Sequence, residues 1–175
     1  MTLRCWTMIG RAGLLALGVS TQALHADPDD GLPIDNLQTR VSAFEAALSS
    51  GEFAAVLDFL PPLMLEDIAA SQDMTVEALR AAVIAQIKVV NAGVDFSKIE
   101  FDMGLESAVY GIGKQGRPVA VMQARTSQPE AEDTVTPVVA FMDAGVWYLV
   151  RIDGPDSQAM LTRLFPDLTD LNLSR

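Results

Sequence analysis

The chain has 175 residues, half of them hydrophobic, and a formal net charge of −11 at pH 7. This length is sufficient for one domain with a substantial hydrophobic core. Nucleic-acid binding needs a basic surface, so the acidic balance argues against DNA or RNA as a partner.

The first 26 residues have the pattern of a cleavable secretory signal. Arg4 and Arg11 precede a short apolar run over 12–19, and small and polar residues then lead to Ala26. Signal peptides share this order: a positively charged region, a short apolar core and small residues before the cleavage site. The run is shorter than the ~20 apolar residues that span a bilayer. We therefore expect export, to the periplasm of a Gram-negative cell or into the medium otherwise, with no membrane anchor after cleavage.

Cleavage after Ala26 would remove Cys5 and His25, the only cysteine and histidine of the chain. The mature part would keep ten basic and 23 acidic residues, for a formal charge of −13. Without a thiol or imidazole it has no Ser-His-Asp or Cys-His site and no typical zinc or copper site. We expect no metal and no cofactor, and we interpret 27–33 as a flexible, solvated acidic lead.

Apolar residues at helical spacing dominate the first half of the mature chain. A stripe along one face predicts a first helix that ends at Gly51, and the stripe comprises Ile34, Leu37, Val41, Phe44 and Leu48. A second apolar helix over 53–60 should stop at Pro61-Pro62, because proline blocks helix continuation. One or two further helical turns are expected over 63–70. A third helix should begin after Thr75 and run to Gly93, with its stripe at Val76, Leu79, Val83, Ile87 and Val90.

From residue 97 the hydrophobic period changes from near four to two, which is typical of half-buried strands. We expect strands over 97–103, 107–112, 119–126, 134–142 and 146–152. Glycine-containing turns at 113–116 and 143–145 separate them, and Pro155-Asp156 introduces a short C-terminal helix. The helical stripes and strand residues such as Phe141 and Trp147 are expected to form one shared core.

Helices followed by hairpin-connected strands predict an α+β fold with an antiparallel sheet of about five strands, as a single domain over 34–175. The order resembles the NTF2-like (cystatin-like) superfamily, through the junction Gly51-Glu52-Phe53, the break at Pro61-Pro62 and the terminal strand over 145–151. The resemblance covers roughly 34–165. It implies that the N-terminal helices pack on a strongly curved sheet to form a cone. Enzymes, ligand carriers and interaction modules all use this fold, so it does not decide function.

The segment Gly111–Gly116 fits the pattern G-x-G-x-x-G. A dinucleotide site needs this pattern between a strand and a helix, so that the helix N-terminus faces the pyrophosphate. Here a strand follows, with Val119, Ala120 and Val121. We therefore interpret the segment as a hairpin turn in which glycines supply positive φ angles.

Carboxylate, tyrosine, arginine and lysine side chains remain available for chemistry, and they suggest two candidate sites. Asp102 and Tyr110 could act as base and proton donor inside a cone, as in ketosteroid isomerase, but Asp102 alternates out of phase with its apolar neighbours and should face solvent. The ligand-binding candidates are Arg125, Trp147, Arg151 and Tyr110. An arginine in an apolar series can hold an anionic head group. Alternatively, these arginines lie at the sheet rim with wet guanidinium groups, and Trp147 belongs to the core.

These patterns predict an exported, soluble, non-catalytic module that binds a small apolar or amphipathic ligand or a partner protein. The alternative is an NTF2-like enzyme that uses carboxylate and tyrosine acid–base chemistry. No residue is assigned a catalytic role. The sequence is compatible with a homodimer.

Overall fold

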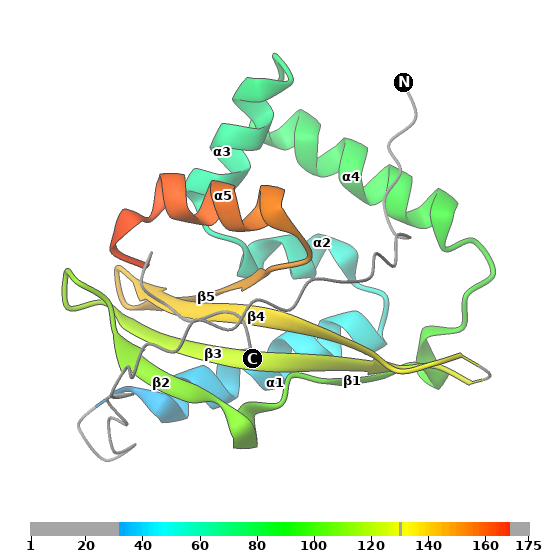
Figure 1. The fold of residues 1–175 in the computed structure, drawn as a ribbon. Coiled ribbons are helices and arrows are strands. Elements are labelled where there is room, and N and C mark those ends of the chain that lie inside the picture. The colour runs from blue at the N-terminus through cyan, green and yellow to red at the C-terminus, as the bar shows by residue number, and fades with distance from the viewer. Residues whose placement is uncertain (1–31, 130, 169–175) are drawn as a thin grey trace, which may run out of the picture.

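The computed structural model describes residues 32–129 and 131–168 (Figure 1). The expected signal over 1–26 and nearly all of the acidic lead lie outside these described residues. Among the described residues, no helix has both the length and the apolar character needed to cross a membrane.

Four helices occupy the first half of the described chain. They are α1 (Ile34–Ser49), α2 (Phe53–Val56), α3 (Pro62–Ser71) and α4 (Val76–Val90). As expected, Gly51 follows the end of α1 with a positive φ of 71°. The Thr75 side chain accepts from the Ala78 N–H and caps α4, also as expected. α2 continues into a 3₁₀ turn, η1 (Leu57–Phe59). α3 is longer than the sequence suggests, because Pro62 occupies its first turn, where a missing N–H costs nothing.

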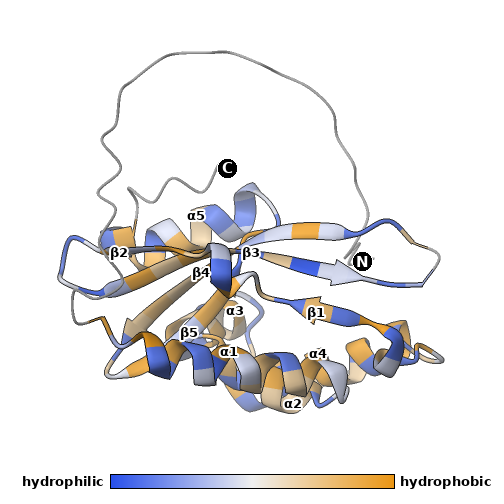
Figure 2. Cartoon of the chain, turned by 90° about the horizontal axis from the view of Figure 1, so that it is seen from below, coloured by the Kyte–Doolittle hydropathy of each residue, from blue (hydrophilic) through white to orange (hydrophobic). Residues whose placement is uncertain are grey.

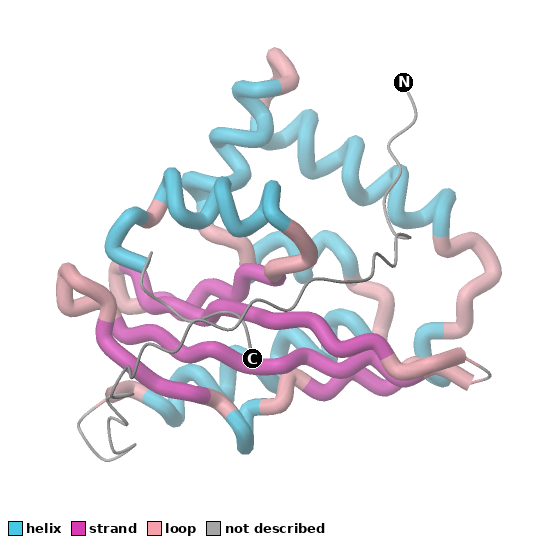
Figure 3. The backbone as a smooth tube through the Cα atoms, viewed as in Figure 1, coloured by secondary structure: helices cyan, strands magenta, loops and turns pink. Residues whose placement is uncertain are grey.

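The strands form a strongly curved five-stranded antiparallel sheet, so the α+β prediction is confirmed (Figures 1 and 3). The strands are β1 (Glu100–Asp102), β2 (Val109–Ile112), β3 (Pro118–Ser127), β4 (Thr134–Asp143) and β5 (Val146–Arg151). β1 and β2 both pair with β3, which is followed in the sheet by β4 and β5. The expected C-terminal helix is α5 (Pro155–Leu164).

The first two strands begin later than the alternation predicts. Phe96–Lys98 is a 3₁₀ turn, because the Asp95 carboxylate accepts from the Ser97 N–H at 3.2 Å and from its hydroxyl at 2.6 Å. A second 3₁₀ turn at Leu105–Ser107 delays β2 and follows Gly104. Gly104 has a φ of 62°, and a Cβ there would lie 2.5 Å from the Gln123 carbonyl oxygen. Hydrogen bonds of the Asp95 side chain and the close backbone approach at Gly104 therefore replace strand by 3₁₀ turns, although the hydrophobic alternation predicts strand there.

Both hairpin turns are confirmed. Ala144 and Gly145 have φ angles of 48° and 81° between the paired residues Asp143 and Val146, as a tight two-residue hairpin requires. The Gly113 N–H donates to the Arg117 carbonyl oxygen at 2.8 Å. The glycine-rich segment thus joins β2 to β3 and opens no helix.

The sheet is covered on both faces, which corrects the expectation of one shared core. α1 covers one face and α5 the other (Figure 1). The α1 face includes Leu37, Val41, Met122, Ala140, Trp147 and Leu149. The α5 face includes Met64, Val119, Val139, Phe141, Leu161 and Phe165. Phe141 and Trp147 are both buried but lie on opposite faces, because the register pairs Phe141 with Tyr148 and Met142 with Trp147.

The stripe of α4 does not face the sheet as expected. α4 packs mainly on α3 and α2, and its buried Leu79 joins Leu65 and Ala69 of α3 in a separate cluster. Polar and apolar residues follow one another in bands along the helices and strands (Figure 2). α3 supplies the apolar surface that α4 covers. The sequence predicts only a turn or two over 63–70, so it does not indicate this surface.

A buried ion pair attaches the C-terminal segment to the sheet. Arg117 Nε donates to Asp167 Oδ2 at 2.8 Å, and Arg117 Nη1 lies 3.0 Å from Asp143 Oδ1. Asp167 lies in the 3₁₀ turn η4 (Pro166–Leu168), and its carbonyl oxygen also accepts from the Lys114 N–H at 3.3 Å. The guanidinium carbon is 5.4 Å from the Phe141 ring centroid. Removing one partner of such a pair leaves an uncompensated buried charge.

Because both faces of the sheet are buried, truncation of Phe141 or of Trp147 should destabilise the fold. Phe141→Ala and Trp147→Ala should each lower the free energy of unfolding by about 3–5 kcal/mol, since each removes a buried aromatic side chain and leaves a cavity. Val135→Ala, on β4 but 52% exposed, is the control and should cost less than about 1 kcal/mol. Chemical denaturation measures all three. A Trp147→Ala variant as stable as the wild type would contradict the core assignment.

A second prediction concerns the contact of α3 with α5. Both Asp67 carboxylate oxygens accept from Arg163, each at 2.7 Å. This hydrogen bonding, aided by the opposite charge, lowers the pKa of Asp67 below its ordinary value of 3.8. A depressed folded-state pKa contributes stability above the unfolded-state pKa, and that contribution is lost as the pH falls through the folded-state value. An NMR titration of the Asp67 carboxyl should show the lowered midpoint, and Arg163→Gln should raise it. An unchanged midpoint in Arg163→Gln would refute the pairing.

Candidate functional site

An apolar groove of about 260 Å³ lies where η1, α3, α4 and β5 meet. Its apolar lining comes from all four elements and includes Leu57, Leu60, Leu65, Val76, Val146 and Tyr148. Asp58, Glu66 and Arg80 are its charged residues. The groove is partly open to solvent. Apolar walls with a few convergent polar groups are typical of small-molecule sites.

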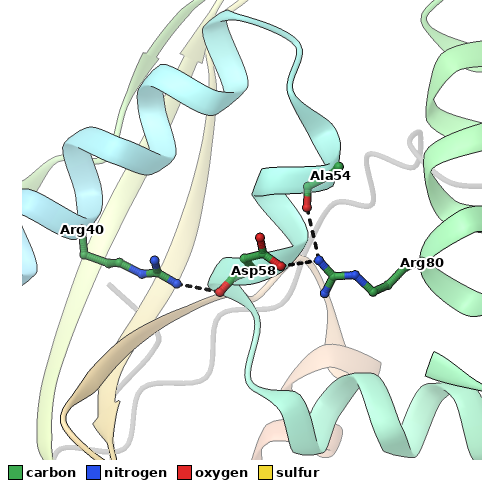
Figure 4. Close-up of polar contacts among 4 residues, drawn as sticks. All are labelled: Arg40, Ala54, Asp58 and Arg80. Carbon is green, nitrogen blue, oxygen red and sulfur yellow. Dashed lines mark hydrogen bonds and ion pairs between the residues drawn. The ribbon is translucent and has the colours of Figure 1, made fainter. Parts of the chain in front are cut away.

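The ion pair between Arg80 and Asp58 joins α4 to η1 at this groove (Figure 4). Arg80 Nη2 donates to Asp58 Oδ1 and to the Ala54 carbonyl oxygen, the latter at 3.3 Å. The Asp58 side chain is 63% exposed and that of Arg80 is 29% exposed. The carboxylate therefore remains open to a solvent-borne ligand while its guanidinium partner is largely held by the protein.

Arg40 supports the same turn from the side of α1. Its Nη2 donates to the Asp58 carbonyl oxygen at 2.6 Å, and its Nε donates to the Trp147 carbonyl oxygen at 3.1 Å. Its guanidinium carbon lies 3.9 Å from the centroid of the Phe59 ring, a cation–π distance. Trp147 Nε1 in turn donates to the Pro33 carbonyl oxygen at 3.2 Å. One arginine thus ties α1, η1 and the outer strand β5 together.

Sequence reasoning missed Arg40, Asp58 and Arg80. A signal was present for Arg80, which follows Val76 by four residues and therefore lies on the same side of the helix, next to the buried stripe. Arg40 is the one basic residue within α1. No local pattern shows that these side chains converge on η1, because their partners are 18 and 22 residues away along the chain.

The four predicted ligand-binding residues do not form one site. Trp147, Arg151 and Tyr110 lie on the α1 face, where Trp147 is 3% exposed and part of the core. Arg125 is exposed on the opposite face of the sheet and lies 3.8 Å from Asp133. Burial lowers the pKa of Arg151, which nearby Asp153 partly offsets, and burial raises the pKa of Tyr110.

The candidate acid–base pair is not assembled either. Asp102 pairs with Arg125 and Tyr110 pairs with Ala120, so the alternation along β3 directs the two side chains to opposite faces. Asp102 is exposed, as expected from its phase, and its Oδ1 accepts from the Gly104 N–H at 2.8 Å.

The described residues contain no group of three or more histidine, cysteine, aspartate or glutamate side chains arranged to hold a metal ion. Comparisons of the chain with protein-family models, with curated proteins and with solved structures return no match. The fold and the site together define an α+β protein whose helices and outer strand enclose an apolar surface groove beside an arginine–aspartate pair.

The two arginines should differ in their effect on stability. Arg40→Gln should cost about 2 kcal/mol or more, because it removes charge-assisted hydrogen bonds to two carbonyl groups and the contact with Phe59. Arg80→Gln should cost less than about 1 kcal/mol, since its partner Asp58 is mostly solvated. Thermal unfolding of both variants measures the difference. Equal losses would show that Arg40 is not the link between α1, η1 and β5.

Proposed function

We propose that the chain is an exported, non-catalytic binding module with an NTF2-like fold, and that its ligand is a small amphipathic molecule bearing a cationic group. The proposal rests on one observation, the apolar groove bounded by Asp58, Glu66 and Arg80. The order of helices and strands and the curvature of the sheet support the fold assignment. The signal-like first 26 residues support export.

The packing of the sheet argues for a peripheral site and against one inside the cone. Between α1 and the sheet, Leu37, Met122 and Val138 are all buried and in one cluster. Buried side chains in protein cores generally leave few voids larger than a water molecule. The acid–base alternative is not proposed, because Asp102 and Tyr110 lie on opposite faces of the sheet.

The lining and rim of the groove determine the class of ligand. The volume of about 260 Å³ lies below the range of about 300–1,000 Å³ that is typical of small-molecule sites, so we propose that only a short alkyl chain enters. At the rim, Glu66 is exposed and Asp58 shares its charge with Arg80. The chain as a whole carries −11, which favours approach of a cation. An apolar tail with an ammonium head satisfies both features.

Three ligands with the same eight-carbon tail test this proposal: octylammonium, octanol and octanoate. The affinity should fall in that order, because only the head group changes and the rim is acidic. Glu66→Gln should reduce the preference for octylammonium over octanol and leave octanol binding unchanged. Isothermal titration calorimetry and chemical-shift mapping measure affinity and location together.

Two tryptophan variants, one inside the groove lining and one outside it, test where the ligand binds. Val146→Trp places a large ring in the groove lining and should abolish binding, whereas Val135→Trp introduces the same ring at an exposed strand position that is not part of the lining. Equal binding by both variants, or tighter binding of octanoate than of octylammonium, would refute the proposed site.

A further inference from the structure

α4 is apolar on both of its sides, although only one side packs against the protein. On the inner side Leu79 is buried and Val76, Val83 and Ile87 are half-buried. On the outer side Val89 is 76% exposed, the highest value among the large exposed hydrophobic side chains of the described residues. A solvent-exposed helix ordinarily carries charged and polar residues on that side.

The outer apolar residues form a regular seam. Ala78, Ala82, Ala85 and Val89 are all exposed and follow one another at spacings of four, three and four. This spacing places them along one stripe and matches the seam by which two helices pack as a coiled coil. Three of the four side chains are methyl groups, so the axis of a second helix could approach closely. Figure 1 shows α4 at the periphery of the molecule, away from the strands.

We propose that this seam binds the same seam of a second copy of the chain, in an antiparallel homodimer. Between residues 78 and 94 the chain has no aspartate or glutamate, although its net charge is −11. Two copies would repel each other through most of their surfaces, and this segment is where that repulsion is weakest. An interface related by a two-fold axis uses the same patch on both copies, which a self-complementary seam provides.

The charges beside the seam select the antiparallel direction. Antiparallel pairing matches Ala78 with Val89 of the second copy and Ala82 with its Ala85. Glu77 and Lys88 are eleven residues apart, about three turns, and therefore lie on the same side of α4. In this register Lys88 of each copy lies beside Glu77 of the other, which gives two reciprocal ion pairs. Parallel pairing would instead place Glu77 of the two copies at the same level along the helix axis, and likewise Lys88.

Sedimentation velocity of the full chain over a concentration series tests the proposal. The wild type should show a concentration-dependent monomer–dimer equilibrium. Ala85→Glu should weaken the dimer on the order of tenfold or more, because it places a charge against an apolar layer. Ala43→Glu, an exposed alanine within α1, makes the same chemical change away from the seam and should leave the equilibrium unchanged. Val89→Asp should repeat the effect of Ala85→Glu, and circular dichroism should show both folded.

A charge exchange tests the register. Lys88→Glu and Glu77→Lys should each weaken the dimer by about two- to fivefold, and the double variant should restore it. A wild type that stays monomeric up to about millimolar concentration, far above typical specific affinities, would overturn the proposal. So would a dimer that Ala85→Glu does not weaken, or a double variant that is weaker than either single one. Each readout is independent of ligand binding in the groove, which lies on the inner side of α4.

Discussion

The fold depends on the burial of β4 on both of its faces. Val138 and Ala140 pack under α1, whereas Val139 and Phe141 pack under α5, and all four side chains are almost inaccessible to solvent. A strand in this position cannot shift its register by one residue without exchanging the two sets between the two layers. The pairing of β4 with β3 and β5 therefore positions every element that covers the sheet.

The candidate groove lies at the periphery of the sheet as a consequence. Because the two faces of the sheet are filled, the apolar groove forms where the outer strand β5 meets η1, α3 and α4. Arg40 stabilises this junction through the carbonyl groups of Asp58 and Trp147, so it acts as a positioning residue for the groove and contributes no side chain to its lining. α4 contributes to two surfaces, since Val76 and Arg80 line the groove and the alanine seam lies on its outer side.

The same geometry explains why an acidic protein carries several well-held arginines. Arg117 and Arg163 each bind a carboxylate from a distant segment, Asp167 and Asp67, and so connect α5 and the residues that follow it to the rest of the fold. The first of these pairs is buried and the second is exposed. We therefore expect the buried pair to matter for folding and the exposed pair mainly to change with pH and salt.

The sequence by itself determined the local features of this protein. Helical spacing, the cap at Thr75, the positive φ at Gly51 and the hairpin turns depend on residues within a few positions of one another, and the structure contains all of them. Tertiary structure alone decided which face of the sheet each helix covers, why α4 packs on α3, and why Arg125 and Arg151 are on opposite sides. It also brought Arg40 and Arg80 to Asp58. These outcomes depend on strand register and on packing between segments far apart along the chain, which no local period encodes.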